Sequence, residues 1–151
     1  MKIELEPIGF VSNQVTEPID ENWGSVKSKL VIEAEFVKGI KGLEQFSHAV
    51  VITFLNKAEF NLSKQIVRRP RGLDTMPEVG IFSQRAKDRP NPIGVTSVNI
   101  LTVGDGFIDV IGLDAINGTP ILDIKPYFPQ YDCIKDATVP GWVNKLMHNY
   151  F

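Results

Sequence analysis

A short segment of the chain combines three cationic side chains with a stiff Pro-Asn-Pro triplet. It spans residues 80–94 and carries Arg85, Lys87 and Arg89 ahead of the triplet. Each proline fixes its own φ and pushes the residue before it, Arg89 or Asn91, toward extended geometry. We therefore predict that this segment forms one wall of a preorganised pocket.

A second segment, residues 113–127, pairs an Asn-Gly-Thr-Pro turn with a short strand. Asp123, Lys125 and Tyr127 are two residues apart, so a strand turns their side chains to one surface. Polar and aromatic groups on one face are suited to substrate binding and proton transfer. Two structural roles stay open, an ion pair between Asp123 and Lys125 that fixes the sheet and packing of Tyr127 on a proline.

The positive charge of the chain is concentrated in one region. The formal net charge is −2, yet seven lysines or arginines stand against three acids between Lys64 and Arg89. Three arginines, Arg68, Arg69 and Arg71, surround a proline and are expected to project toward phosphate groups. An ordinary solvated loop is the alternative interpretation.

The elements that must position these residues are mainly strands. Alternating apolar residues predict strands at 3–11, 31–36, 49–55, 79–82, 98–103, 107–113 and 121–124, with a hairpin turn at Gly104-Asp-Gly106. One helical turn is expected at 42–46 and a short helix at 139–147, and residues 56–77 read as a long polar connection. So many strands in 151 residues predict one mainly β domain, residues 1–151, with a closed or nearly closed barrel and few short helices.

Composition excludes several classes of protein. No window is apolar enough for a membrane span, and the first residues lack the core of a signal peptide, so we expect a cytoplasmic protein. Cys133 is the only cysteine and is expected to be partly buried. His48 and His148 form no ligand pair, so no metal site is predicted.

Three motifs resemble the TsaA-like, or TrmO, family of S-adenosylmethionine-dependent tRNA adenine methyltransferases, in a short single-domain form. They are Gly80-Ile-Phe-Ser-Gln-Arg85, Arg89-Pro-Asn-Pro-Ile-Gly94 and Asn117-Gly-Thr-Pro-Ile-Leu-Asp-Ile-Lys-Pro-Tyr127. The family more often has Asp at position 117 and Ala-Thr at 83–84. The resemblance implies a TsaA-like β-barrel that works as a homodimer, binds S-adenosyl-L-methionine and methylates an adenosine next to the anticodon of tRNA.

The resemblance also implies roles for residues. A cofactor pocket near the dimer interface is expected from Asn56, Lys57, Phe82, Arg85, Gly94, Val95, Leu113, Asp114, Ala115 and Ile116. Arg85 would bind the carboxylate of the cofactor's amino-acid tail by paired hydrogen bonds, and an ion pair with Asp109 or Asp114 is its structural alternative. The catalytic candidates are Asn91, Asp123 and Tyr127, and the substrate-binding candidates are Arg68, Arg69, Arg71, Arg89 and Lys125.

Two other functions remain open at this point. A protein of the same fold could bind the cofactor or another nucleotide as a sensor or adaptor without catalysis. A plain RNA-binding barrel would need exposed aromatic residues over a basic face. It ranks last, because Phe36, Phe46, Phe54 and Phe107 occupy strand positions that we expect to be buried.

Overall fold

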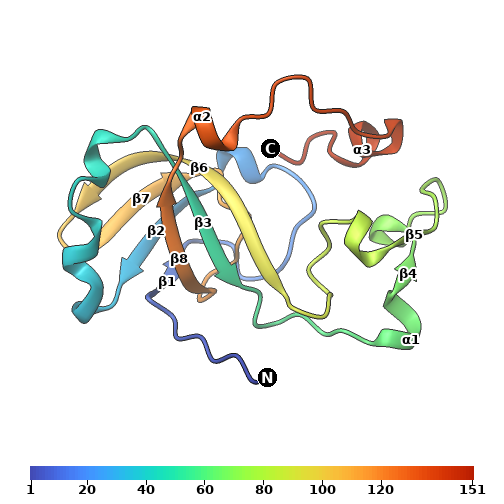
Figure 1. Cartoon of the computed structure of the whole chain (residues 1–151), viewed down its shortest axis with the longest axis horizontal. Coiled ribbons are helices and arrows are strands. Elements are labelled where there is room, and N and C mark those ends of the chain that lie inside the picture. Colours follow the sequence, from blue (N-terminus) through green and yellow to red (C-terminus); the bar gives the residue numbers. More distant parts are fainter.

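A computed structural model describes all residues, 1–151, and shows a closed six-stranded barrel (Figure 1). The strand order is β1-β2-β7-β6-β3-β8, with β8 closing on β1, and every neighbouring pair is antiparallel. The expectation of a mainly β, closed barrel with few short helices is confirmed. None of the helices is long and apolar enough to cross a bilayer.

The elements have the following bounds. The barrel strands are β1 (Gly9–Ser12), β2 (Lys27–Ile32), β3 (His48–Phe54), β6 (Ile93–Gly104), β7 (Phe107–Ile111) and β8 (Pro120–Pro126), and a separate pair comprises β4 (Val67–Arg68) and β5 (Val79–Gly80). The α-helices are α1 (Leu62–Gln65), α2 (Pro129–Asp132) and α3 (Gly141–Leu146). The 3-10 turns are η1 (Trp23–Ser25), η2 (Ala34–Ile40), η3 (Leu43–Gln45), η4 (Pro70–Gly72) and η5 (Ile81–Ser83).

Side chains at every second strand position point inward and fill the barrel. In β3 the inward residues Ala49, Val51 and Thr53 are buried, while the residues between them face outward. Leu30 from β2 and Ile108 from β7 join them in a single apolar cluster. Burial of these β-branched and aliphatic side chains supplies the main stabilisation of the fold.

Several of the expected strands have different bounds; the strand expected at 79–82, for example, stops at Gly80 and is followed by η5. Residues 3–8 are not a strand, and β1 begins only at Gly9. The predicted strand at 31–36 stops at Ile32, and the chain turns into η2, from which Phe36, Val37 and Ile40 pack on the core. Ile40 follows Val37 by three residues and Phe36 by four, so one face of a helical turn can bury them together. The hairpin between β6 and β7 is confirmed, with Gly106 at φ +77°.

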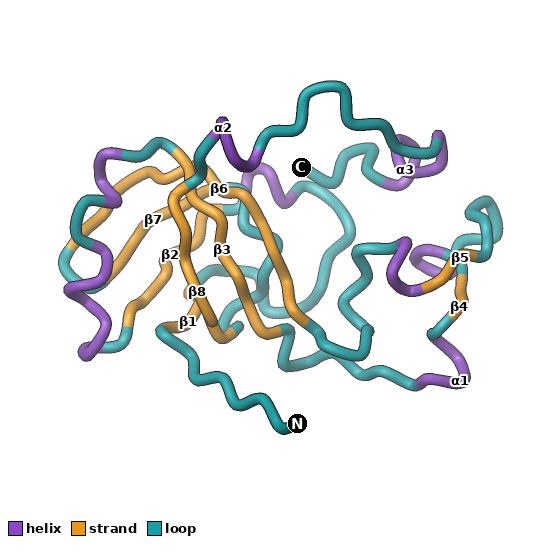
Figure 2. The backbone as a smooth tube through the Cα atoms, viewed as in Figure 1, coloured by secondary structure: helices purple, strands orange, loops and turns teal.

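The chain between β3 and β6 forms an extension beside the barrel. Figure 2 shows α1, β4 and β5 standing apart from the barrel strands, on the side opposite η2. The buried side chain of Gln84 holds this extension together, because its Nε2 donates to the carbonyls of Arg68 (2.9 Å) and Val79 (3.0 Å). The expected connection at 56–77 is therefore a small folded unit that leads into the cationic loop.

Candidate functional site

The strands β8, β3 and β6 present a continuous outer face. Their register places Asp123 beside Ile52 and Ile52 beside Val95. Two residues further along each strand, Lys125, Val50 and Ser97 are aligned in the same way. We call this surface the outer face; it comprises Val50, Ile52, Phe54, Ile93, Val95, Ser97, Asp123 and Lys125. Residues predicted for cofactor, catalysis and substrate binding thus share one side of the barrel.

Arg85 lies against the edge of this face. Its Nη2 donates to the carbonyl oxygen of Val95 at 2.6 Å, the side chain is exposed, and it forms no ion pair. The alternative partners are occupied, since Asp109 pairs with Lys29 at 2.7 Å and Asp114 accepts from two hydroxyl groups. One fixed contact therefore orients the guanidinium while its other N–H groups remain available for a carboxylate.

Asp114 is held by residues that the sequence did not single out. The hydroxyl of Thr96 donates to Oδ1, and the hydroxyl of Tyr150 donates to Oδ2 at 2.9 Å. The tail that carries Tyr150 is fixed in turn by hydrogen bonds from the backbone N–H groups of residues 22–23 to the carbonyls of residues 149–150. Burial, aided by the neighbouring Asp114 carboxylate, raises the pKa of Tyr150 well above its ordinary value.

Replacing Tyr150 by phenylalanine is expected to lower the free energy of unfolding by about 1–3 kcal/mol at pH 8, because Asp114 loses a buried hydrogen bond. A raised tyrosine pKa stabilises the fold below the unfolded value of 10.0, and this contribution is lost as pH rises above it. The difference in unfolding free energy between the wild type and Tyr150→Phe should therefore shrink above about pH 10. One proton sets a limit of about 1.4 kcal/mol per pH unit, and solvent screening of the half-buried ring keeps the loss below that limit.

Urea denaturation at pH 8 and pH 11 measures this effect. Tyr131→Phe is the matched control, because that ring is exposed, and it should leave the free energy of unfolding unchanged at both pH values. An equal difference between the wild type and Tyr150→Phe at both pH values would contradict the assigned role of the hydroxyl.

The other predicted cofactor residues gather at the same end of the barrel. The N–H of Leu55 donates to the carbonyl of Pro92 at 2.8 Å, which places Asn56 and Lys57 beside the Pro-Asn-Pro triplet. Gly94 follows the triplet, and an added Cβ there would lie 2.5 Å from Thr53 Oγ1. The position therefore has no room for a larger side chain without movement of its neighbour.

Residues 113–116 contribute mainly their backbone. The side chains of Leu113 and Ala115 are only 1% and 3% exposed and belong to the core. The carbonyl of Ile116 accepts a hydrogen bond from the Thr119 hydroxyl at 2.8 Å. Only backbone groups of Leu113 and Ala115 can face a ligand, whereas Asp114 offers its carboxylate as well.

The cationic loop is braced by contacts of its own. Arg89 Nη1 donates to the carbonyl of Gln84 at 3.0 Å, and Asp88 accepts from Lys87 (2.6 Å) and from the N–H of Glu59 (3.1 Å). Partial burial opposes ionisation, but the Lys87 ammonium and the Glu59 amide outweigh it and hold the pKa of Asp88 below its usual value. These contacts hold the loop in one conformation.

The prediction that all three arginines at 68–71 project is wrong. Arg69 donates through Nη1 to the carbonyl of Met76, and Arg68 is half-buried with no hydrogen-bond partner for its Nε. Arg71 lies 3.7 Å from Asp20 and over the ring of Tyr150, at 5.5 Å from its centroid. Packing of the extension uses these side chains, since a folded unit this small has few apolar residues to hold it.

The three catalytic candidates do not surround one point in a single chain. Tyr127 donates its N–H to the carbonyl of His48, at the start of β3, whereas Asn91 lies beside Leu55, just after the end of β3. Seven residues at about 3.3 Å each separate these levels by about 23 Å. Asp123 lies between them, opposite Ile52.

Asp123 and Lys125 form the ion pair left open as an alternative. Lys125 Nζ lies 2.5 Å from Asp123 Oδ2, and this hydrogen bond, with the negative charge of Asp123, raises the pKa of Lys125. Both side chains remain partly exposed on the outer face. The pair therefore coexists with an accessible carboxylate.

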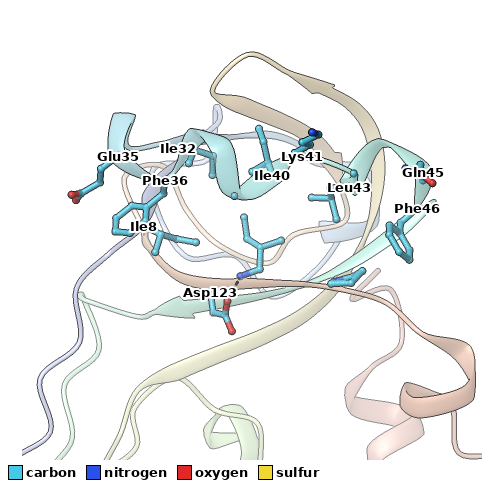
Figure 3. Close-up of a pocket in the computed structure, with 14 residues that line it drawn as sticks. Ile8, Ile32, Glu35, Phe36, Ile40, Lys41, Leu43, Gln45, Phe46 and Asp123 are labelled. Atoms are coloured by element: carbon cyan, nitrogen blue, oxygen red, sulfur yellow. Dashed lines mark hydrogen bonds between the residues drawn. The ribbon is translucent and has the colours of Figure 1, made fainter.

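Two cavities lie toward the Tyr127 end. The first, of about 630 Å³, is bounded by η2, η3 and β8; half of its lining residues are hydrophobic, among them Ile8, Ile32, Phe36, Ile40, Leu43 and Ile124. Figure 3 shows Asp123 at its rim, with the carboxylate directed away from these apolar side chains. The second, of about 760 Å³, includes His48, Ser97 and Tyr127.

Neither cavity includes Arg85 or another residue predicted for the cofactor. Cys133, expected to be partly buried, is exposed, and His148 faces solvent as expected. The structure contains no group of three or more His, Cys, Asp or Glu side chains arranged to hold a metal ion.

The sequence was compared with those of known proteins and protein families. The sequence matches the tRNA-methyltransferase O N-terminal domain over residues 12–133. A probable S-adenosyl-L-methionine-binding protein of Methanothermobacter thermautotrophicus is 36% identical over 138 residues, covering 89% of this chain and 96% of that protein. A human tRNA (adenine(37)-N6)-methyltransferase is 41% identical over 103 residues, covering 67% of this chain and 22% of that enzyme.

A solved structure has the same fold. The crystal structure of TrmO from Pseudomonas aeruginosa superposes with a TM-score of 0.74 at 29% sequence identity. The match covers 91% of this chain and 62% of the TrmO chain, so this chain spans less than two thirds of that protein.

Proposed function

Because the chain belongs to the tRNA-methyltransferase O N-terminal domain family, we propose that it is a cytoplasmic S-adenosyl-L-methionine-dependent methyltransferase. Its proposed substrate is the exocyclic amino group of an adenosine next to the anticodon in tRNA. The human relative carries the name of a tRNA adenine methyltransferase, and the archaeal relative is named for the cofactor. The observation that carries the proposal is the exposed Arg85 guanidinium, fixed beside Val95 without an acidic partner.

The residues at the Arg85 end fit this cofactor. S-adenosyl-L-methionine supplies an electrophilic methyl group on a sulfonium centre and carries an amino-acid carboxylate, a ribose and an adenine. Arg85 has N–H groups for the carboxylate. The ring of Phe82 is 76% exposed and offers a stacking surface. Asn56, Lys57, Asp114 and the backbone near Val95 and Ile116 offer polar groups for the ribose and the adenine edge.

The acceptor amine needs help from the protein. Its lone pair is delocalised into the adenine ring, so hydrogen-bond acceptors that bind its N–H groups make it more nucleophilic. Asn91, whose side chain is exposed, and Asp123, on the outer face, have oxygen atoms for this task. Asp123 would take the proton that the amine loses, and Tyr127 would contact the base.

A homodimer through the outer face would join the separated parts of the site. Phe54 and Ile93 are each 40% exposed and Val95 is 46% exposed, so this face carries an apolar patch in one subunit. A two-fold axis that lies in the plane of the interface, perpendicular to the strands, would run the strands of the two subunits in opposite directions. The Tyr127 end of one subunit would then approach the Arg85 end of the other, despite the separation of about 23 Å within one chain.

The cationic side chains would guide tRNA to this site. Arg89 and Lys125 lie next to the proposed cofactor and acceptor positions, and Arg68, Arg69 and Arg71 belong to the neighbouring extension. Their combined field would attract phosphates although the whole chain is slightly acidic.

A methyl-transfer assay tests the function directly. Purified protein is incubated with cofactor labelled in the methyl group and with tRNA from cells that lack the protein, and nucleosides are analysed by mass spectrometry. We expect label in N6-methylated adenosine derivatives, and none with Asp123→Asn, which should still bind the cofactor. Stoichiometric cofactor binding without transfer would instead support the sensor or adaptor function.

A further inference from the structure

A cavity at the Tyr127 end is lined by aromatic rings and neutral polar side chains. It has a volume of about 760 Å³ and lies where η3, the first residue of β3 and the start of α2 meet. We call it the aromatic cavity; its lining comprises Gln45, Phe46, Ser47, His48, Ser97, Tyr127, Phe128, Pro129 and Gln130. This volume lies within the range of pockets that bind small molecules.

Four rings form its walls. Phe46 and Phe128 stack with centroids 5.8 Å apart and planes inclined by 26°, and the rings of His48 and Tyr127 are tilted by 58° with centroids 6.3 Å apart. Phe128 and His48 remain exposed to solvent. Rings that are fixed by packing but accessible on one side can stack on an incoming planar group at low entropic cost.

The polar side chains of the cavity have unused hydrogen-bonding groups. The amides of Gln45 and Gln130 and the hydroxyl of Ser97 make no hydrogen bond within the chain, whereas the Ser47 hydroxyl bonds His48 Nδ1 at 2.7 Å. Amides and hydroxyls both donate and accept, and no lining residue carries a permanent charge. A neutral planar ligand with donors and acceptors on its edge fits this set better than a phosphate or an apolar peptide.

We propose that the aromatic cavity binds an unpaired nucleobase of RNA. Recognition of single-stranded RNA combines stacking of splayed bases on aromatic or histidine rings with hydrogen bonds to the base edges, and the cavity offers both. Lys125 is 63% exposed in one subunit and would lie at the edge of the proposed dimer interface, within reach of the neighbouring phosphate. The inference rests on the proposed function, in which the cavity holds a base of the tRNA while the cofactor binds at the Arg85 end.

Fluorescence anisotropy of labelled octaadenylate, with saturating S-adenosylhomocysteine in the cofactor site, tests this proposal. Gln45→Trp fills the cavity from the exposed turn η3, outside the outer face, and should weaken octaadenylate binding about 5- to 150-fold. Glu44→Trp on the same turn is the matched control. It removes a negative charge, so its electrostatic effect can only strengthen RNA binding.

Two variants of Tyr127 provide independent evidence. Tyr127→Phe keeps the stacking surface and should keep most of the octaadenylate affinity, whereas Tyr127→Ala should lose it. Circular dichroism establishes that each variant is folded. Unchanged affinity in Gln45→Trp, or no binding of octaadenylate to the wild type, would overturn the proposal.

Calorimetry and light scattering separate this inference from the proposed function. S-adenosylhomocysteine should bind Gln45→Trp as tightly as the wild type, and the mass of the assembly in solution should be the same for both proteins. Loss of S-adenosylhomocysteine affinity would assign the cavity to the cofactor, and a change of mass would assign it to a protein contact; either result overturns the base site. A wild type that binds no S-adenosylhomocysteine contradicts the proposed function itself.

Discussion

Replacing Arg85 by alanine is expected to weaken the binding of S-adenosyl-L-methionine by about 10- to 150-fold. The guanidinium has no acidic partner in the chain and is oriented by one hydrogen bond to Val95, so its charge is available to the ligand carboxylate. Charge-assisted hydrogen bonds contribute about 1.5–3 kcal/mol, which corresponds to this range. Isothermal titration calorimetry at moderate salt measures the dissociation constant.

Lys87→Ala is the matched control for Arg85→Ala. It removes a positive charge two residues away, but the Lys87 ammonium is already paired with Asp88 at 2.6 Å. Its effect should stay within about threefold, as for a typical exposed ion pair. Arg85→Lys should fall between the wild type and Arg85→Ala, because lysine keeps the charge and loses the paired geometry. Equal dissociation constants for the wild type and Arg85→Ala would show that the ligand carboxylate does not bind Arg85.

Replacing Ile93 by glutamate is expected to split the proposed homodimer and to abolish methyl transfer. Ile93 is 40% exposed and lies beside Phe54 on the outer face. A carboxylate enclosed there without a partner would cost at least about 3 kcal/mol, on the order of 100-fold in the dimer dissociation constant. Light scattering at micromolar concentration should then give the mass of one subunit.

Val31→Glu is the control for Ile93→Glu. Val31 is 46% exposed but lies on β2, away from the outer face of β8, β3 and β6. The same chemical change there should leave both the mass and the activity intact. A dimer that survives Ile93→Glu, or a wild type that is a monomer, would show that the outer face is not the interface.

Most strands of the barrel could be predicted from the sequence, because apolar inward residues alternate with outward ones. The hairpin at residues 103–107 was equally clear, since Gly106 occupies a left-handed turn position. The sequence failed where the same apolar residues fit a second period. Residues 31–36 alternate like a strand, but Phe36 also aligns with Ile40 on one face of a helical turn, and tertiary packing decided between them.

The site was foreseen in part, for a similar reason. Local stiffness identified the cationic loop, and strand periodicity placed Asp123 and Lys125 on one face. The contact between Tyr150 and Asp114 joins residues 36 positions apart in the chain, and no local pattern indicates it. The burial of Phe54 was predicted wrongly, because alternation fixes which face a residue occupies but does not determine whether that face is covered.

A crystal structure of the protein with S-adenosylhomocysteine tests the central claim most directly. The account predicts two subunits that meet at the outer face, with the ligand carboxylate on Arg85 and the sulfur facing the β8 of the other subunit. A ligand bound in the apolar cavity behind η2, with Arg85 in solvent, would contradict it.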